Sequence, residues 1–121
     1  MAKADIQQFL GLLFASRDYA HKAHLATESY SQHKALNKFY VNIIDLADDL
    51  AEGWMGRNEQ KIGEIPTINA PKGEPLAVMK RLLEVVKDTR DFVEGDTMLS
   101  NIMDEIEQLF TSTIYKLKFL K

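Results

Sequence analysis

Four long segments of this chain repeat apolar residues at spacings of three and four, and this periodicity restricts the possible folds more than any other feature. A stripe with that spacing predicts an amphipathic α-helix with one buried face. No segment reads as a strand. The first helix is expected from about Ala4 to Ala26, where the stripe consists of Ile6, Phe9, Leu10, Leu13, Phe14 and Ala20.

The second helix is expected to run from about Gln32 to Arg57. Ser29 or Ser31 in the preceding turn is the expected N-cap, because a serine hydroxyl accepts a hydrogen bond from the first free amides of a helix. Gly56 marks the expected end of the helix. Its broad apolar face is formed by Leu36, Phe39, Tyr40, Ile43, Ile44, Ala47, Leu50, Ala51 and Trp54.

The third and fourth helices are separated by a short break. Pro75 suits the first turn of a third helix that runs to about Val93. Gly95 stops that helix, and Asp96 caps a fourth that continues almost to Lys121. We expect the fourth helix to face inward with Leu99, Ile102, Met103, Ile106, Leu109, Phe110, Leu117 and Leu120.

Residues 58–73 hold two prolines and two glycines and predict one long connection, although residues 58–62 could instead extend the second helix. Sixteen residues reach about 50 Å when extended, which is enough to span a helix of this size. The second and third helices would then run parallel. The sequence therefore predicts an all-α, ferritin-like four-helix bundle with one long crossover between helices 2 and 3, as a single domain over residues 1–121.

Composition limits the class of protein. With 45% apolar and 27% charged residues, the chain has the make-up of an ordinary globular domain. It holds no apolar run of 18 residues, no signal-peptide pattern and no cysteine, so we expect a cytoplasmic protein without a membrane span or a thiolate metal site. The net charge of −3 and the lack of a basic N-terminal block argue against DNA binding.

Two histidines and two acids stand out as candidate metal ligands. Asp48 and Glu52 are four residues apart on one face of the second helix, and His33 lies only about 60° from Asp48 around the axis. His24 lies near the end of the first helix. Imidazole and carboxylate groups bind iron, manganese and zinc. Because His33, Asp48 and Glu52 border the apolar arc, a second helix or subunit would have to complete the site.

This segment resembles the ligand region of the Dps-type miniferritins, in the short form of ferritin-like proteins of tailed bacteriophages. In that family two histidines of one subunit and two acids of its two-fold partner hold iron, and His24, His33, Asp48 and Glu52 match those positions. The resemblance implies a homo-oligomer, dimer or larger, that binds iron, or manganese or zinc, for storage or ferroxidase-type oxidation. The family's further acid falls on Asn37 here, and its lysine-rich tail is absent.

The residues leave a rival interpretation open, and they leave open whether the chain is an enzyme. A non-enzymatic helical-bundle interaction protein of a bacteriophage would bind a partner protein or small ligand without metal. The chain has neither a glycine-rich phosphate loop nor a serine nucleophile motif. Acids on the last two helices alternate with lysine and arginine, so we expect solvated faces for Glu84, Asp88, Asp91, Asp104, Glu105 and Glu107.

Overall fold

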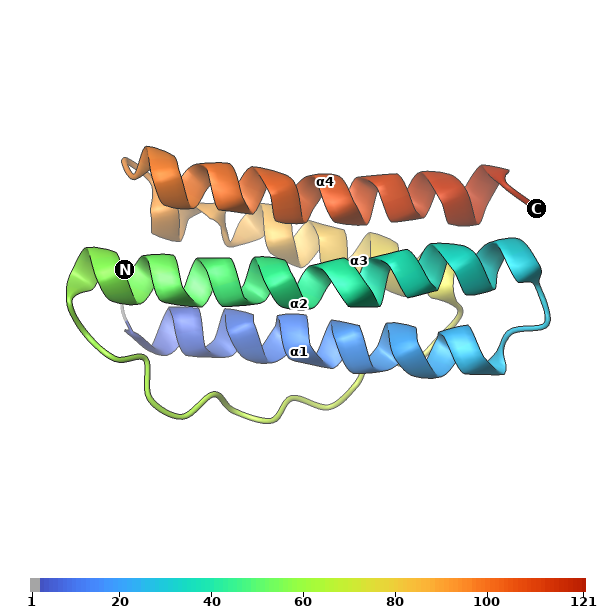
Figure 1. Cartoon of the computed structure of the whole chain (residues 1–121), viewed down its shortest axis with the longest axis horizontal. Helices are drawn as coiled ribbons and strands as arrows, with labels where there is room; N and C mark the ends of the chain where they lie inside the picture. The colour runs from blue at the N-terminus through green and yellow to red at the C-terminus, as the bar shows by residue number, and fades with distance from the viewer. Residues whose placement is uncertain (1–2) are drawn as a thin grey trace.

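The computed structural model describes residues 3–121 as four long α-helices that pack side by side (Figure 1). No residue in this range belongs to a strand, so the prediction of an all-α four-helix bundle is confirmed. None of the described helices is both long and apolar enough to span a membrane. The elements are α1 (Lys3–Ala26), α2 (Tyr30–Asn58), α3 (Pro75–Asp88), the 3₁₀ helix η1 (Arg90–Val93) and α4 (Thr97–Phe119).

The long connection of residues 59–74 makes α2 and α3 run in the same direction, while α1 and α4 run the opposite way (Figure 1). The predicted crossover between the second and third helices is therefore present. Extensive packing joins α1 to α2, α2 to α4 and α4 to α3. By contrast, α1 and α3 meet at only a few positions. The bundle therefore has one comparatively open side, which lies between α1 and α3.

The crossover is held against α1 at several points. Gln7 Nε2 donates to the Ile62 carbonyl at 2.7 Å, and the Tyr19 hydroxyl donates to the Gly73 carbonyl at 2.6 Å. Between them, Gly11 lets the crossover approach closely, because a Cβ at this position would lie 2.7 Å from the Pro66 carbonyl oxygen. These contacts fix a long irregular segment along one helix.

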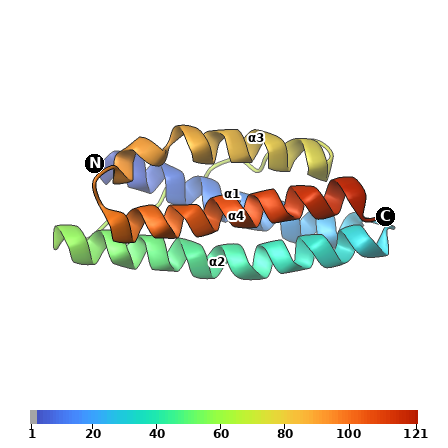
Figure 2. The ribbon, with the colours of Figure 1, turned by 90° about the horizontal axis from the view of Figure 1, so that it is seen from above.

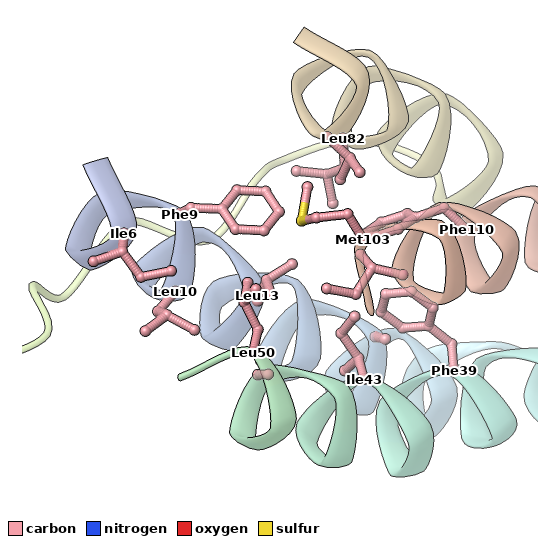
Figure 3. Packing of buried hydrophobic residues seen from close by; sticks show 14 of the residues in the cluster. Ile6, Phe9, Leu10, Leu13, Phe39, Ile43, Leu50, Leu82, Met103 and Phe110 are labelled. Atoms are coloured by element: carbon pink, nitrogen blue, oxygen red, sulfur yellow. The ribbon is translucent and has the colours of Figure 1, made fainter. Parts of the chain in front are cut away.

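The core lies where the apolar stripes of the four helices meet (Figure 3). Phe39 of α2 and Phe110 of α4 pack edge to face with their ring centroids 4.9 Å apart. The stripe predicted for the last helix is wrong at its end, because Leu120 lies beyond α4 and is 45% exposed. The labelled core side chains of Figure 3 come from all four helices: Ile6, Phe9, Leu10, Leu13, Phe39, Ile43, Leu50, Leu82, Met103 and Phe110.

Helix starts follow the local signals in the sequence. Ser29 is the N-cap of α2, since its hydroxyl accepts a hydrogen bond from the Gln32 amide at 3.3 Å. Asp96 caps α4 by accepting from the Leu99 amide at 3.1 Å. The same hydrogen bond, reinforced by Arg57, holds the pKa of Asp96 below its ordinary value. Pro75 begins α3, as predicted.

One predicted helix end is confirmed to within one residue and another is wrong. The second helix was expected to end at about Arg57, and α2 ends at Asn58, with Glu59 as its C-cap in the left-handed conformation at φ of 47°. Gly56, the expected marker of this end, lies inside the last turn. Arg57 lies beside the start of α4, where its Nε donates to Asp96 at 2.9 Å. The third helix stops at Asp88 rather than Val93, and the chain tightens into η1.

Candidate functional site

His24 and His33 form a reciprocal clamp, here called the histidine clamp, between the end of α1 and the start of α2. Each ring donates from Nδ1 to the backbone carbonyl of the other residue at 2.8 Å. The two rings stack with their centroids 3.7 Å apart. The carbonyl of His24 belongs to the last turn of α1, where no helical amide follows to pair with it, so the His33 ring satisfies it.

The histidine clamp is part of a larger aromatic cluster. His21 stacks on Tyr40 with a centroid distance of 4.2 Å, and Tyr40 meets His24 edge to face. Because a carbonyl only accepts, Nδ1 of each clamp ring carries the hydrogen, which leaves Nε2 with the lone pair when the ring is neutral. Metal-binding histidines are oriented by similar hydrogen bonds. Nε2 is therefore the atom that would bind the metal predicted from the sequence.

Asp48 and Glu52 are exposed and lie far along α2 from the histidine clamp. Fifteen residues separate His33 from Asp48, which is about 22 Å along a helix axis. Bonds from zinc to nitrogen or oxygen are only about 2 Å long. Between residues 3 and 121, no three histidine, aspartate or glutamate side chains are grouped so that they could hold a metal ion. Binding of iron, manganese or zinc by these four residues between chains stays a prediction.

The open side of the bundle carries a cavity of about 510 Å³ between α1 and α3. Its apolar lining includes the rings of Phe9 and Phe92, which meet edge to face at 5.6 Å. The exposed carboxylates of Asp5, Asp88 and Asp91 also line the cavity, and we call them its rim and the two rings its floor. We call the site the acidic cavity, and its lining consists of Asp5, Gln8, Phe9, Leu12, Val85, Asp88, Thr89, Asp91 and Phe92.

A second cavity of about 510 Å³ lies at the other end of the same side, where α1 ends and α3 begins. It is lined by both Lys22 and Glu74, so its charge has no single sign. Tyr19 also lines it, and burial raises the pKa of this phenol to about 12, with Glu74 adding to the shift and Arg81 opposing it. The acidic cavity therefore has the more distinctive chemistry.

Sequence reasoning did not find the acidic cavity. Asp88 and Asp91 were expected to be solvated acids, and they are exposed, but their position around an apolar floor depends on how η1 turns back toward α1. Val85 and Phe92 lie outside the apolar stripe predicted for the third helix, which consists of Leu76, Met79, Leu82, Leu83, Val86 and Val93. The available signal for the cavity was the presence of these apolar residues outside the stripe and close to acids in the sequence.

The fold and the cavity define an all-α four-helix bundle with one long crossover and an acid-rimmed apolar cavity. A sequence model of the family described as "Family of unknown function (DUF5856)" matches residues 24–117, which is most of the chain. The protein belongs to this family.

A relative comes from a bacteriophage. The chain is 29% identical over 117 residues to the "Uncharacterized 14.6 kDa protein in mobD-ri intergenic region" of Enterobacteria phage T4. The aligned part covers 96% of this chain and 88% of the relative. No solved structure matches the chain. The expected link to bacteriophage proteins therefore has direct support.

The resemblance to Dps-type miniferritins and to ferritin-like proteins is wrong. The matching family model includes the whole segment from His24 to Glu52 on which the resemblance rested, and it describes a different family. The physical reason lies in the histidine clamp. Histidines near the turn of a helical hairpin can be held there by stacking and by bonds to helix-end carbonyls, so the match in residue type and spacing did not require a metal.

Proposed function

We propose that this protein is a non-enzymatic interaction protein of a bacteriophage, acting in the cytoplasm of the infected bacterium, and that it binds a partner protein at the acidic cavity. The observation that supports this most is the combination of an apolar floor with a rim of carboxylates on the open side of the bundle. Such a site favours a segment that carries apolar side chains and positive charge together.

The chemistry of the rim selects the partner. An apolar side chain of the partner would pack on Phe9 and Phe92, and a neighbouring lysine or arginine would pair with Asp5, Asp88 or Asp91. Sites of this kind bind amphipathic helices by their apolar faces, and about 510 Å³ lies within the usual range for binding cavities. Opposite charge at the rim adds association rate and selectivity rather than most of the affinity.

The lining offers little for catalysis. Its hydroxyl, from Thr89, lies within hydrogen-bond distance of the carbonyls of Val85 at 2.9 Å and Val86 at 3.0 Å, so the end of α3 holds its proton. The remaining polar groups are carboxylates and the amide of Gln8. Binding is therefore the activity that these side chains support best.

The test is a titration with a labelled amphipathic peptide of leucine and lysine, followed by fluorescence anisotropy. Asp88→Lys combined with Asp91→Lys should weaken binding at least about tenfold, whereas a leucine–glutamate peptide should not bind. Glu28→Lys combined with Glu64→Lys is the matched control, because it changes the net charge equally at exposed positions away from the cavity. Equal loss of binding in both variants would show general charge attraction and overturn the proposal. A chelator should have no effect.

A further inference from the structure

One exposed stripe of α2 changes the sign of its charge halfway along the helix. Val41, which is 49% exposed, lies at its centre. Lys34 comes seven residues before Val41 and Asp48 seven after it, while Tyr30 comes eleven before and Glu52 eleven after. Seven and eleven residues are close to two and three whole turns, so all five lie along one line of the helix. We call these five exposed residues the α2 stripe.

A second pair of opposite charges flanks the α2 stripe on the side of α4. Lys38 comes three residues before Val41 and Asp45 four after it. Both line a shallow groove with Glu105 of α4. Burial lowers the pKa of Lys116 on α4, and the neighbouring charge of Lys38 lowers it further. The basic half of this face therefore extends from α2 onto α4.

Lys34 lies over the ring of Tyr30, 5.8 Å from its centroid, but the charged residues of this face have no opposite charge beside them on α2. Lys34 and Lys38 are four residues apart, and so are Asp48 and Glu52. Like charges at this spacing repel each other on a helix surface. Within residues 3–121 none of these four side chains forms an ion pair. A facing surface whose charges run in the opposite order would relieve the repulsion between Lys34 and Lys38 and between Asp48 and Glu52.

We propose that two copies of this chain form a two-fold dimer in which the α2 stripes pack antiparallel, centred on Val41. A two-fold axis at Val41 brings Lys34 of one copy opposite Asp48 of the partner subunit, and Lys38 close to Asp45 of the partner subunit. The same contacts recur on the other side of the axis. Because a two-fold interface joins a patch to itself, the change of sign at Val41 makes this patch complementary to its own copy.

The position of α2 allows this packing. Figure 2 shows α2 along one edge of the bundle, and all five residues of the α2 stripe are exposed. The acidic cavity lies between α1 and α3 and shares no residue with the stripe. The dimer therefore goes beyond the proposed function and leaves the peptide-binding side free. Since the contacts are mainly exposed charge pairs, the dimer should be weak and sensitive to salt.

Charge reversal tests the interface directly by sedimentation equilibrium at low salt, from micromolar to millimolar protein. The wild type should form a dimer that dissociates in about 1 M salt. Lys34→Glu with Lys38→Glu should be monomeric, and so should Asp45→Lys with Asp48→Lys. An equal mixture of the two variants should form a heterodimer, because every facing pair is again of opposite sign. A chain with all four substitutions should form a homodimer like the wild type.

Lys61→Glu with Lys72→Glu is the matched control, because it gives the same net charge through exposed residues of the crossover and should leave the dimer intact. Circular dichroism checks that each variant keeps its helices. A wild type that stays monomeric at millimolar concentration overturns the proposal, as does a dimer that survives Lys34→Glu with Lys38→Glu. Failure of the two reversed variants to pair, or dissociation by a chelator, contradicts it as well.

Discussion

Replacing His33 with alanine is expected to lower the free energy of unfolding by about 2 kcal/mol. The substitution removes the 2.8 Å hydrogen bond to the carbonyl of His24, and a part-buried bond of this kind contributes about 1 kcal/mol. It also removes the stacked contact with the His24 ring at 3.7 Å, which is worth about 1 kcal/mol for an aromatic pair. The end of α1 would lose one of its ties to the start of α2.

The assay is urea unfolding followed by circular dichroism, with His24→Ala, the double variant and His21→Ala measured alongside. Both hydrogen bonds of the clamp run from a ring to a backbone carbonyl, so the stack is what the two side chains share. The coupling energy between His24→Ala and His33→Ala should therefore be about 1 kcal/mol. His21→Ala is the control, because it loses the stack on Tyr40 and a tilted contact with the His24 ring at 6.2 Å but no hydrogen bond to a helix-end carbonyl, and it should cost about 1 kcal/mol or less.

Two results would refute this reasoning. A loss at His33→Ala no larger than that at His21→Ala would mean that the bond to the helix-end carbonyl contributes nothing. A coupling energy near zero would mean that the two rings do not stack in solution. In either case the histidine clamp would not account for His24 and His33, and metal binding would be the better explanation for them.

The core and the crossover give two further predictions. Phe110→Ala should destabilise the fold by about 3–5 kcal/mol, because this ring is 1% exposed, whereas Phe119→Ala, at 62% exposure, should cost little by the same urea measurement. Burial raises the pKa of Tyr19 to about 12, so between pH 10 and 12 the unfolded chain loses this proton while the folded chain keeps it, and stability should fall. Urea midpoints measured from pH 9 to 11 should fall less steeply in Tyr19→Phe.

Local signals in the sequence were enough to predict the four helices and where they begin. Ser29, Pro75 and Asp96 act on their own neighbouring amides or backbone angles, so they can be read without a tertiary structure. Helix ends were harder to predict than helix starts. The third helix ends at Asp88 rather than at about Val93, since the chain tightens into η1, and no proline or glycine marks that change in the sequence.

The site could be predicted much less well. His24 and His33 were predicted as metal ligands, and spacing alone could not show that each ring bonds the other's backbone. The acidic cavity requires Phe9 and Phe92 to meet across the open side of the bundle. That contact depends on the short η1 turn after α3, where the apolar periodicity of a helix no longer applies.

The most direct test of the central claim is to map peptide binding by NMR on the isotopically labelled protein. The proposed function predicts that the leucine–lysine peptide shifts the signals of Leu12, Val85 and Phe92 and leaves those of the histidine clamp unchanged. Shifts confined to the acidic stretch of α2 around Asp48, with none at the acidic cavity, would contradict the account.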